Sequence, residues 1–396
     1  MAALHRLWRG LPQGPRRRLL ATGTSWLAPR PTQPSPTCHL GAAIAGEISS
    51  ASGLGESARL HLAGLAALHV PHWRIDQSTP PPGVPLILHA NAAIPALEMF
   101  RLGRHLVQGR RIVGVWPWEL PSAPASWRAG FDYVHEVWAP SEFSAAAIRA
   151  AAPPGWDPAR IRVVPHPVAC QPPAPALLTP APLVRAQLGL PQDAVVTLAA
   201  VNLASAFTRK NPLGAIEAHR RAFGPRPDRV LLLRVGNPHH APADFARIAE
   251  AVAPLPNVVL DTETRPRADA QAAMAAADIV LSRHRSEGFG LVPAEAMLLA
   301  KPVILTAWSG TEQFATDATT IRIPYTLVPA TDPRGVFTAP GAHWAEPDLD
   351  AAAAALVHLA DNPARRLHLG TAARNAALAL DAVPLAQALR SLGLDV

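Results

Sequence analysis

The sequence has little cysteine, with two residues, Cys38 and Cys170, in a chain of 396. They form no CxxC pair, which argues against a disulfide framework and against a zinc site built on cysteine. Histidine does not take over this role, because His239 and His240 stand in a proline-rich loop without a third ligand at metal spacing. We therefore expect no metal and no cofactor, and a reducing compartment such as the cytoplasm suits the chain.

Long apolar runs are also missing. No stretch of about 18 apolar residues occurs, so no membrane-spanning helix is predicted. Residues 1–38 form a basic, proline-rich leader in which polar residues 22–25 interrupt the only segment that resembles a secretory signal. We expect this leader to be disordered and the protein to be cytoplasmic. The amphipathic start at residues 4–11 adds the hypothesis of a peripheral protein at the inner face of the cytoplasmic membrane.

Charged residues are few, at 16% of the chain, and their balance is basic, with a formal net charge of +7. A basic balance is compatible with nucleic acid, an anionic membrane surface or a negatively charged small substrate. The basic residues are scattered, and no helix-turn-helix, zinc-finger or RNA-binding signature accompanies them. We therefore expect an anionic substrate or membrane surface and no nucleic acid.

What the chain does have is a repeated alternation of short apolar runs with longer helical patterns, which predicts a parallel α/β architecture. Hydrophobic residues make up 49% of the chain, enough for two domain cores. A helix over residues 144–151 has Ser141 as its cap, and residues 58–68 and 351–392 also have helical patterns. The predicted strands are residues 42–45, 86–89, 111–116, 133–139, 161–164, 194–201, 230–235, 258–260, 279–281 and 303–305.

A proline-rich stretch at residues 165–182 divides the pattern into two similar halves and predicts an interdomain linker. Two such halves form a cleft, with ligands at the carboxyl ends of the strands. We assign residues 39–180 to an acceptor-side domain with its linker and residues 181–375 to a nucleotide-binding domain. Residues 376–396 are expected to form a helix that returns to the first domain.

Two glutamates spaced eight residues apart, Glu287 and Glu295, give the best chemical signal. A predicted strand precedes them, and Pro293 fits the first turn of a helix between them. Free N–H groups at a helix start and nearby glycines favour an anion such as phosphate, and a carboxylate there can accept hydrogen bonds from ribose hydroxyls. The alternative is that neither glutamate binds a ligand. Glu295 would then only interact favourably with the helix dipole, and Glu287 would be a solvated loop residue. The segment joining them begins with Gly288, Phe289, Gly290 and Leu291.

Two adjacent cations, Arg209 and Lys210, follow the predicted strand 194–201 and suit a diphosphate. They would neutralise its charge in the bound donor and stabilise the nucleoside diphosphate as it leaves. The alternative is a solvated basic loop that binds no ligand. Asn237 follows the next strand and is a weaker candidate for lining the cleft.

The third signal is a glycine-rich loop at residues 46–59, in which Gly53 and Gly55 let the backbone approach a phosphate or sugar. With Asp76 it also imitates a dinucleotide-binding fingerprint, a weak match on its own. The fourth signal lies on the first half. Trp118 and Glu119 could form an aromatic and acidic wall for an acceptor, and His89 ends a strand beside the presumed cleft.

In combination these segments resemble the retaining glycosyltransferases of family 4, in particular a bacterial branch that acts on cell-surface glycans. The resemblance covers residues 41 to about 374. It implies the GT-B fold, in which two Rossmann-like domains face a central cleft. The segment from Glu287 to Glu295 resembles the family's E-x7-E motif, and residues 209–212 resemble its Arg-Lys-Asn-Pro element. Residues 46–59 are similar to the glycine-rich loop of that bacterial branch.

The resemblance assigns roles to these residues. It implies that Glu295 holds the ribose, that Glu287 lies near the donor sugar, and that Arg209 and Lys210 bind the pyrophosphate. The glycine-rich loop would border the donor phosphates and the acceptor. Many members carry a cleft histidine where this chain has Trp118 and Glu119, so no catalytic histidine is assigned.

The resulting hypothesis is a hexosyltransferase that moves a sugar from a nucleotide-sugar donor to a glycan or lipid-linked acceptor in polysaccharide biosynthesis, with retention of configuration. Three alternatives stay open: a nucleotide-sugar epimerase on the same fold, an NAD-dependent oxidoreductase, and a non-catalytic sugar-binding protein.

Overall fold

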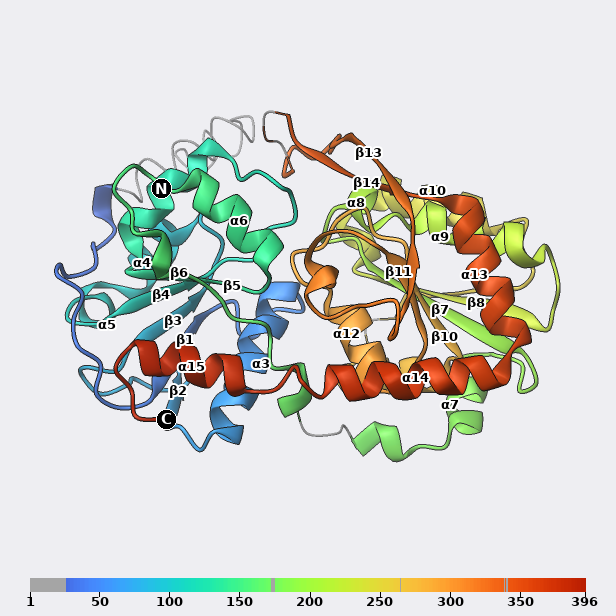
Figure 1. Ribbon diagram of the computed structural model, residues 1–396, viewed down its shortest axis with the longest axis horizontal. Coiled ribbons are helices and arrows are strands. Elements are labelled where there is room, and N and C mark those ends of the chain that lie inside the picture. The colour runs from blue at the N-terminus through green and yellow to red at the C-terminus, as the bar shows by residue number, and fades with distance from the viewer. Residues whose placement is uncertain (1–25, 172–174, 264, 338, 340) are drawn as a thin grey trace, which may run out of the picture.

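The computed structural model describes residues 26–171, 175–263, 265–337, 339 and 341–396 and contains two six-stranded parallel sheets, one in each half (Figure 1). The first sheet has the order β2-β1-β3-β4-β5-β6. Each of its strands except β2 coincides with a predicted strand, because short apolar runs buried on both faces favour parallel strands. Their bounds are β1 Ala42–Gly46, β2 His72–Arg74, β3 Leu86–His89, β4 Ile112–Val115, β5 Glu136–Ala139 and β6 Ile161–Val163.

Helices cover the first sheet, and two of them, α3 and α6, begin at side-chain caps. Ser141 caps α6 by accepting the backbone N–H of Ser144, as predicted. Helix α3 begins at Gly53, five residues before the predicted start, because Ser52 accepts the N–H of Gly55. The elements of this half are α3 Gly53–Ala67, α4 Pro95–Leu102, α5 Arg104–Val107 and α6 Glu142–Ala151, with 3-10 helices η1 Ala125–Tyr133 and η2 Pro158–Arg160.

The second sheet has the order β12-β11-β10-β7-β8-β9, and all five strands predicted for this half are found in it. The sixth, β12, was not predicted. The bounds are β7 Val195–Asn202, β8 Arg229–Gly236, β9 Val258–Asp261, β10 Ile279–Ser282, β11 Val303–Thr306 and β12 Ile321–Ile323.

Short helices connect the halves and cover the second sheet. Within the proline-rich stretch lie η3 Val168–Cys170 and η4 Pro175–Leu178. The remaining elements of the second half are α7 Ala181–Gln187, α8 Phe207–Lys210, α9 Pro212–Phe223, η5 Pro238–His240, α10 Pro242–Val252, α11 Arg267–Ala276, α12 Leu291–Leu298 and η6 Ser309–Gln313.

The C-terminal helical stretch is broken into three helices, α13 Leu349–Asp361, α14 Pro363–Ala377 and α15 Val383–Ser391. Pro363 cannot donate a backbone hydrogen bond, so α13 ends before it. Helix α14 runs from the second half toward the first, and α15 lies beside α3 (Figure 1). Leu385 and Leu389 of α15 join the apolar cluster that contains Ile44 and Leu65 of the first half.

A two-stranded hairpin, β13 Tyr325–Pro329 and β14 His343–Pro347, was not predicted. Although it belongs to the second half by sequence, Phe337 and Trp344 join the same apolar cluster as Trp118 and Trp127 of the first half. The hairpin segment therefore bridges the two halves.

Most of the predicted leader, residues 1–25, lies outside the described residues. Residues 26–38 were expected to be disordered but lie against the first half. Arg30 forms an ion pair with Asp132 at 2.8 Å, and the Thr32 carbonyl lies 2.8 Å from His135 Nε2. Among the described helices, none has the length and apolar character needed to cross a bilayer.

Candidate functional site

The structure brings Glu287, Arg209 and Lys210 together where the carboxyl ends of two neighbouring strands meet. Arg209 and Lys210 end α8, just after β7, and Glu287 follows β10, which pairs with β7. Lys210 Nζ lies 2.5 Å from Glu287 Oε1, and Arg209 Nη1 lies 3.2 Å from Oε2. The predicted phosphate ligands and the predicted sugar ligand thus form one ion-paired cluster.

Arg209 is fixed on several sides. It is 3% exposed and donates to the Ser286 carbonyl at 2.7 Å and to Ser205 Oγ at 2.9 Å. Its guanidinium lies 5.1 Å from the centre of the Phe337 ring, and Nη2 lies 3.5 Å from Glu119 Oε1. A cation held by this many neighbours is preorganised for charge that develops beside it.

The pKa values of the two carboxylates in the cluster, Glu287 and Glu119, are shifted in opposite directions. Burial alone would raise the pKa of Glu287, but the charges of Lys210 and Arg209 outweigh it and lower the pKa to about 2. For Glu119, burial dominates and raises the pKa, because Arg209 is shared and Glu287 adds repulsion. Glu287 is therefore ionised at neutral pH, whereas the charge of Glu119 is disfavoured.

The segment between the two glutamates crosses the seam between the halves. Gly288 lies so close to the first half that an added Cβ would be 3.2 Å from the Trp118 carbonyl oxygen. Ser141 Oγ donates to the Gly288 carbonyl at 2.6 Å. Gly290 has φ of +99°, and a Cβ there would be 2.5 Å from Thr311 Cγ2, so a side chain is excluded on two grounds. Phe289 is buried, and Leu291 is the first residue of α12.

Glu295 lies in the second turn of α12 and takes part in a bridge between the halves. Arg267 Nη2 lies 2.9 Å from Glu295 Oε1, and Arg267 Nε lies 2.8 Å from Oε1 of Glu56 on α3. Glu56 also accepts from Gln171 Nε2 at 2.9 Å. Burial raises the pKa of Glu295 to about 7, against the lowering effect of Arg267. The predicted ribose ligand is thus held by an arginine and is only partly ionised at neutral pH.

The glycine-rich loop also faces the second half. A Cβ on Gly55 would lie 2.2 Å from the Ser50 carbonyl oxygen, whereas Gly53 faces open space. The Ala51 carbonyl accepts from Asn202 Nδ2 at 3.3 Å, and Asn202 Oδ1 accepts from Asn237 Nδ2 at 3.0 Å. These contacts bring Asn237 and the glycine-rich loop to the same edge of the seam.

His89 ends β3, as expected, but its side chain is turned into the interior. It is fully buried, with Nδ1 3.1 Å from Ser57 Oγ and Nε2 3.1 Å from His61 Nδ1. His166 adds a third ring, 5.7 Å from His61 between centres. Burial lowers the pKa of all three imidazoles, to about 3 for His61 and His166. The reason for the difference is that α3 places Ser57 and His61 over the end of β3, where they shield His89 from an acceptor.

Trp118 is likewise a packing residue. It is 4% exposed, its ring stacks on Phe337 with centres 5.5 Å apart, and its Nε1 donates to the Ser122 carbonyl at 2.8 Å. The expected aromatic wall for an acceptor is therefore closed by the hairpin segment, which brings Phe337 over it. Glu119, beside it, faces Arg209.

No group of three or more histidine, cysteine or carboxylate side chains suited to a metal ion is found within the described ranges. Arg209 and Lys210, the cations predicted to bind a diphosphate, are both paired with Glu287.

Sequence reasoning missed Ser141 as a seam contact, Arg267 and Phe337. Ser141 was recognised only as a helix cap. The hairpin that carries Phe337 was not predicted at all, and Arg267 stands alone in an alanine-rich helix whose partner, Glu56, is distant in sequence.

Residues 201–340 match the family model described as glycosyl transferases, group 1. The chain resembles the solved structure of HepE from Anabaena in complex with UDP-glucose, with a TM-score of 0.61 and 15% identity over 89% of this chain and 100% of that one. It also resembles a glycosyltransferase from Rickettsia africae, with a TM-score of 0.62 and 15% identity over 92% of this chain and 100% of that one.

A third similar structure is WaaG, a glycosyltransferase involved in lipopolysaccharide biosynthesis, with a TM-score of 0.57 and 18% identity over 88% of this chain and 98% of that one. At such identities the likeness concerns the fold, and it confirms the predicted GT-B architecture. No curated protein matches the chain.

Proposed function

We propose that this chain, whose residues 201–340 match the family model described as glycosyl transferases, group 1, moves a sugar from a nucleotide-sugar donor to a glycan or lipid-linked acceptor with retention of configuration. The observation that carries this proposal is the cluster of Glu287 with Arg209 and Lys210 at the ends of β7 and β10. It offers two fixed cations for a leaving diphosphate beside a carboxylate that is ionised at neutral pH.

In the proposed reaction the bond between the anomeric carbon and the diphosphate oxygen breaks, and both electrons leave with the diphosphate. Arg209, Lys210 and the N–H groups at the start of α12 stabilise that charge. Glu287 orients the sugar and steadies positive charge at the anomeric carbon. The acceptor hydroxyl attacks from the side of the leaving group, and its proton passes to a phosphate oxygen.

The two halves divide the work in this proposal. Residues 181–375 hold the donor, with Glu295 accepting hydrogen bonds from the ribose and residues 288–291 and Asn237 lining the nucleotide. Residues 39–180 contribute the acceptor side. Gly53 and Gly55 let the loop before α3 border the phosphates. Glu119 lies on the acceptor side, where it contacts Arg209.

A thermal-shift screen of nucleoside diphosphates and nucleotide sugars tests the proposal. UDP is the first nucleotide to include, because the similar HepE structure contains UDP-glucose. One nucleoside diphosphate should raise Tm, and Glu295→Ala should weaken that shift. The control is Glu250→Ala, which removes an exposed glutamate of α10. If no nucleotide shifts Tm, or if Glu295→Ala responds like Glu250→Ala, the proposal fails.

The same screen separates the alternatives. A shift with NAD instead would favour the oxidoreductase, but Asp76 is engaged by Arg74 at 2.8 Å and by Ser49 at 3.1 Å. Release of free nucleotide without any acceptor would favour the epimerase. Sugar binding without nucleotide binding would favour the non-catalytic protein.

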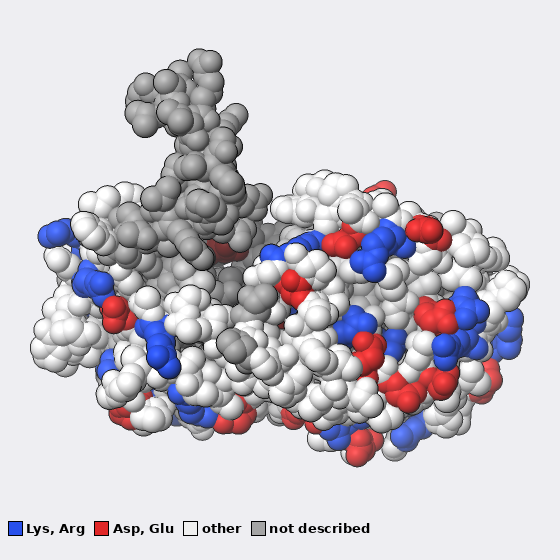
Figure 2. Space-filling view, turned by 90° about the horizontal axis from the view of Figure 1, so that it is seen from above, with Lys and Arg blue, Asp and Glu red and all other residues white. Residues whose placement is uncertain are grey.

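Attachment to an anionic membrane surface at the cytoplasmic face is a separate proposal. Residues 1–25 contain five arginines and no acidic residue, so they carry most of the net charge of +7. On the face seen in Figure 2, Lys and Arg of the described residues are mixed with Asp and Glu and form no continuous basic patch. Flotation with anionic vesicles should therefore fall when residues 16–18 are changed from arginine to glutamine, and equal flotation would contradict the proposal.

A further inference from the structure

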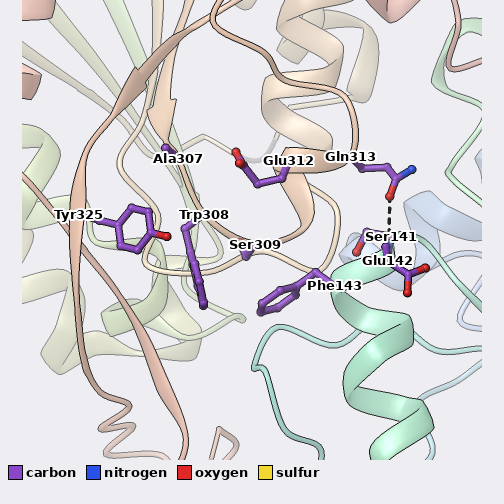
Figure 3. A pocket seen from close by; sticks show the side chains of 9 residues that line it. All are labelled: Ser141, Glu142, Phe143, Ala307, Trp308, Ser309, Glu312, Gln313 and Tyr325. Atoms are coloured by element: carbon purple, nitrogen blue, oxygen red, sulfur yellow. Dashed lines mark hydrogen bonds between the residues drawn. The ribbon is translucent and has the colours of Figure 1, made fainter.

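One pocket, which we call the seam pocket, has a volume of about 360 Å³ and lies outside the ion-paired cluster (Figure 3). It is formed where the start of α6 in the first half meets the loop after β11, η6 and β13 in the second half. Ligand sites are commonly found at such interfaces, and this volume is at the lower end of the range for small-molecule pockets, which suits one or two sugar rings.

Three aromatic rings line the seam pocket. The rings of Phe143 and Trp308 have centres 5.6 Å apart, and those of Trp308 and Tyr325 have centres 5.3 Å apart. Figure 3 shows Phe143 reaching from α6 toward Trp308 across the seam. The C–H groups on the face of a sugar ring carry partial positive charge and pack well on the negative face of an aromatic ring. The lining is thus suited to a carbohydrate.

The polar groups around these rings favour hydroxyls over anions. Glu142 and Glu312 border the pocket with 62% and 38% of their side chains exposed. Each is paired with a single arginine, Arg149 or Arg322, so exposed carboxylate oxygen is left to accept hydrogen bonds. Two carboxylates at the rim disfavour a phosphate, which separates this pocket from the proposed diphosphate site. Trp308 Nε1 also has no partner among the described residues.

The pocket is connected to the transfer site through its walls. Ser309 Oγ accepts the backbone N–H of Glu287 at 2.8 Å, and Ser141 Oγ donates to the Gly288 carbonyl at 2.6 Å. Both serines line the seam pocket. The pocket therefore shares two wall residues with the backbone segment that carries Glu287.

We propose that the seam pocket is a carbohydrate subsite that holds a sugar ring of the acceptor away from the ring being glycosylated. The inference rests on the proposed function and narrows the acceptor to an oligosaccharide or to a lipid-linked one with more than one ring. Because Phe143 comes from the first half and Trp308 from the second, the subsite is complete only when the halves are together.

Saturation-transfer NMR on the full chain with UDP present tests this, using maltose, mannobiose, lactose and chitobiose as probes. At least one disaccharide should receive saturation through its ring protons, and Trp308→Ala should reduce that signal by about tenfold. The matched control is Trp26→Ala, which removes a tryptophan that is 86% exposed and lies outside the pocket. If all four sugars give no signal, or if Trp308→Ala binds like Trp26→Ala, the subsite is refuted.

Two further measurements keep the outcome clear. If Trp308→Ala does not fold, Glu312→Gln replaces it, because this exposed side chain can lose its charge without a cavity. A folded Glu312→Gln that binds sugar as well as wild type also refutes the subsite. The nucleotide thermal shift is run on the same variants and should be unchanged. If the wild type binds a disaccharide but no nucleotide, the proposed function is refuted, while the assignment of the pocket as a carbohydrate site stands.

Discussion

At the scale of single residues, Lys210 and Arg209 are not equivalent although they are adjacent. Arg209 is buried and makes hydrogen bonds to Ser286 and Ser205, whereas the side chain of Lys210 is 22% exposed and its ion pair is with Glu287 alone among the described residues. Arg209 therefore supports the fold of the site as well as its charge. Lys210 is the better residue for testing the chemistry.

Lys210→Ala should reduce kcat by about 10²–10³-fold, the usual effect of removing one preorganised group that stabilises transition-state charge. Arg209 remains to keep Glu287 paired, so Tm should change little. The measurement is steady-state glycosyl transfer to an acceptor. Arg226→Ala, at a 52% exposed arginine, is the control. An unchanged kcat in Lys210→Ala would contradict the assignment.

Glu295 gives a prediction of pH dependence. Its pKa is about 7 in the folded chain and near 4.5 when unfolded, so between these values the folded chain binds more protons. Unfolding free energy should therefore fall as pH rises from 4.5 to 7, by up to about 3 kcal/mol for this group. Glu295→Gln should be more stable than wild type at pH 8 and similar at pH 5.

Urea unfolding of wild type and Glu295→Gln at both pH values measures this difference. The variant should gain stability at pH 8 while it loses nucleotide affinity, because a buried functional charge is retained at a cost in stability. Equal differences at pH 5 and pH 8 would show that burial does not disfavour the Glu295 charge.

At the scale of elements, the sequence pattern predicted the strands well and the hairpin not at all. Strands such as β3 and β7 are short apolar runs, and their burial is visible in the residues themselves. The strands of the hairpin, 325–329 and 343–347, are mixed in polarity and separated by a long proline- and glycine-containing connection. Phe337 in that connection has Trp118 of the other half as its ring partner, a contact that no local pattern reveals. The burial of His89 was missed for the same reason.

The hairpin segment also holds the loop that precedes Arg209 through hydrogen bonds from Arg334. Arg334 Nη1 donates to the Leu203 carbonyl at 2.9 Å and to the Ser205 carbonyl at 2.8 Å. Its Nη2 donates to Asp244 at 2.9 Å. Phe337 then lies against the Arg209 guanidinium. The segment thus holds both ends of the loop between β7 and α8.

Arg334→Ala should weaken nucleoside diphosphate binding about tenfold, because the loop loses hydrogen bonds to a charged group and Arg209 becomes less well placed. Phe337→Leu, which stays apolar but removes the ring under the cation, should have a smaller effect in the same direction. Isothermal titration with UDP measures both. If both variants bind like wild type, the hairpin segment serves only to join the halves.

At the scale of the whole molecule, the two halves are closed on each other. The space beside Lys210, Glu287 and His284 is about 20 Å³, far below the several hundred cubic ångströms of a small-molecule site. Gly288 lies against Trp118 and is held by Ser141. This space is too small for a nucleotide sugar, so we expect the halves to separate when the donor binds.

The bridge from Glu56 through Arg267 to Glu295 resists that separation and involves the proposed ribose ligand itself. Glu56→Gln removes the charge on the first half and leaves the pair of Arg267 with Glu295 intact. If the lost contact contributes about 1.4 kcal/mol, the ratio of closed to open molecules falls about tenfold. Small-angle scattering of the nucleotide-free protein should then show a larger radius of gyration for Glu56→Gln than for the surface control Glu250→Ala. Nucleotide should restore the compact form, because ligand contacts join the halves without the bridge. Identical scattering of Glu56→Gln and Glu250→Ala would mean that apolar contacts, such as those of Phe337 and Leu389, hold the halves together, and that opening is controlled there.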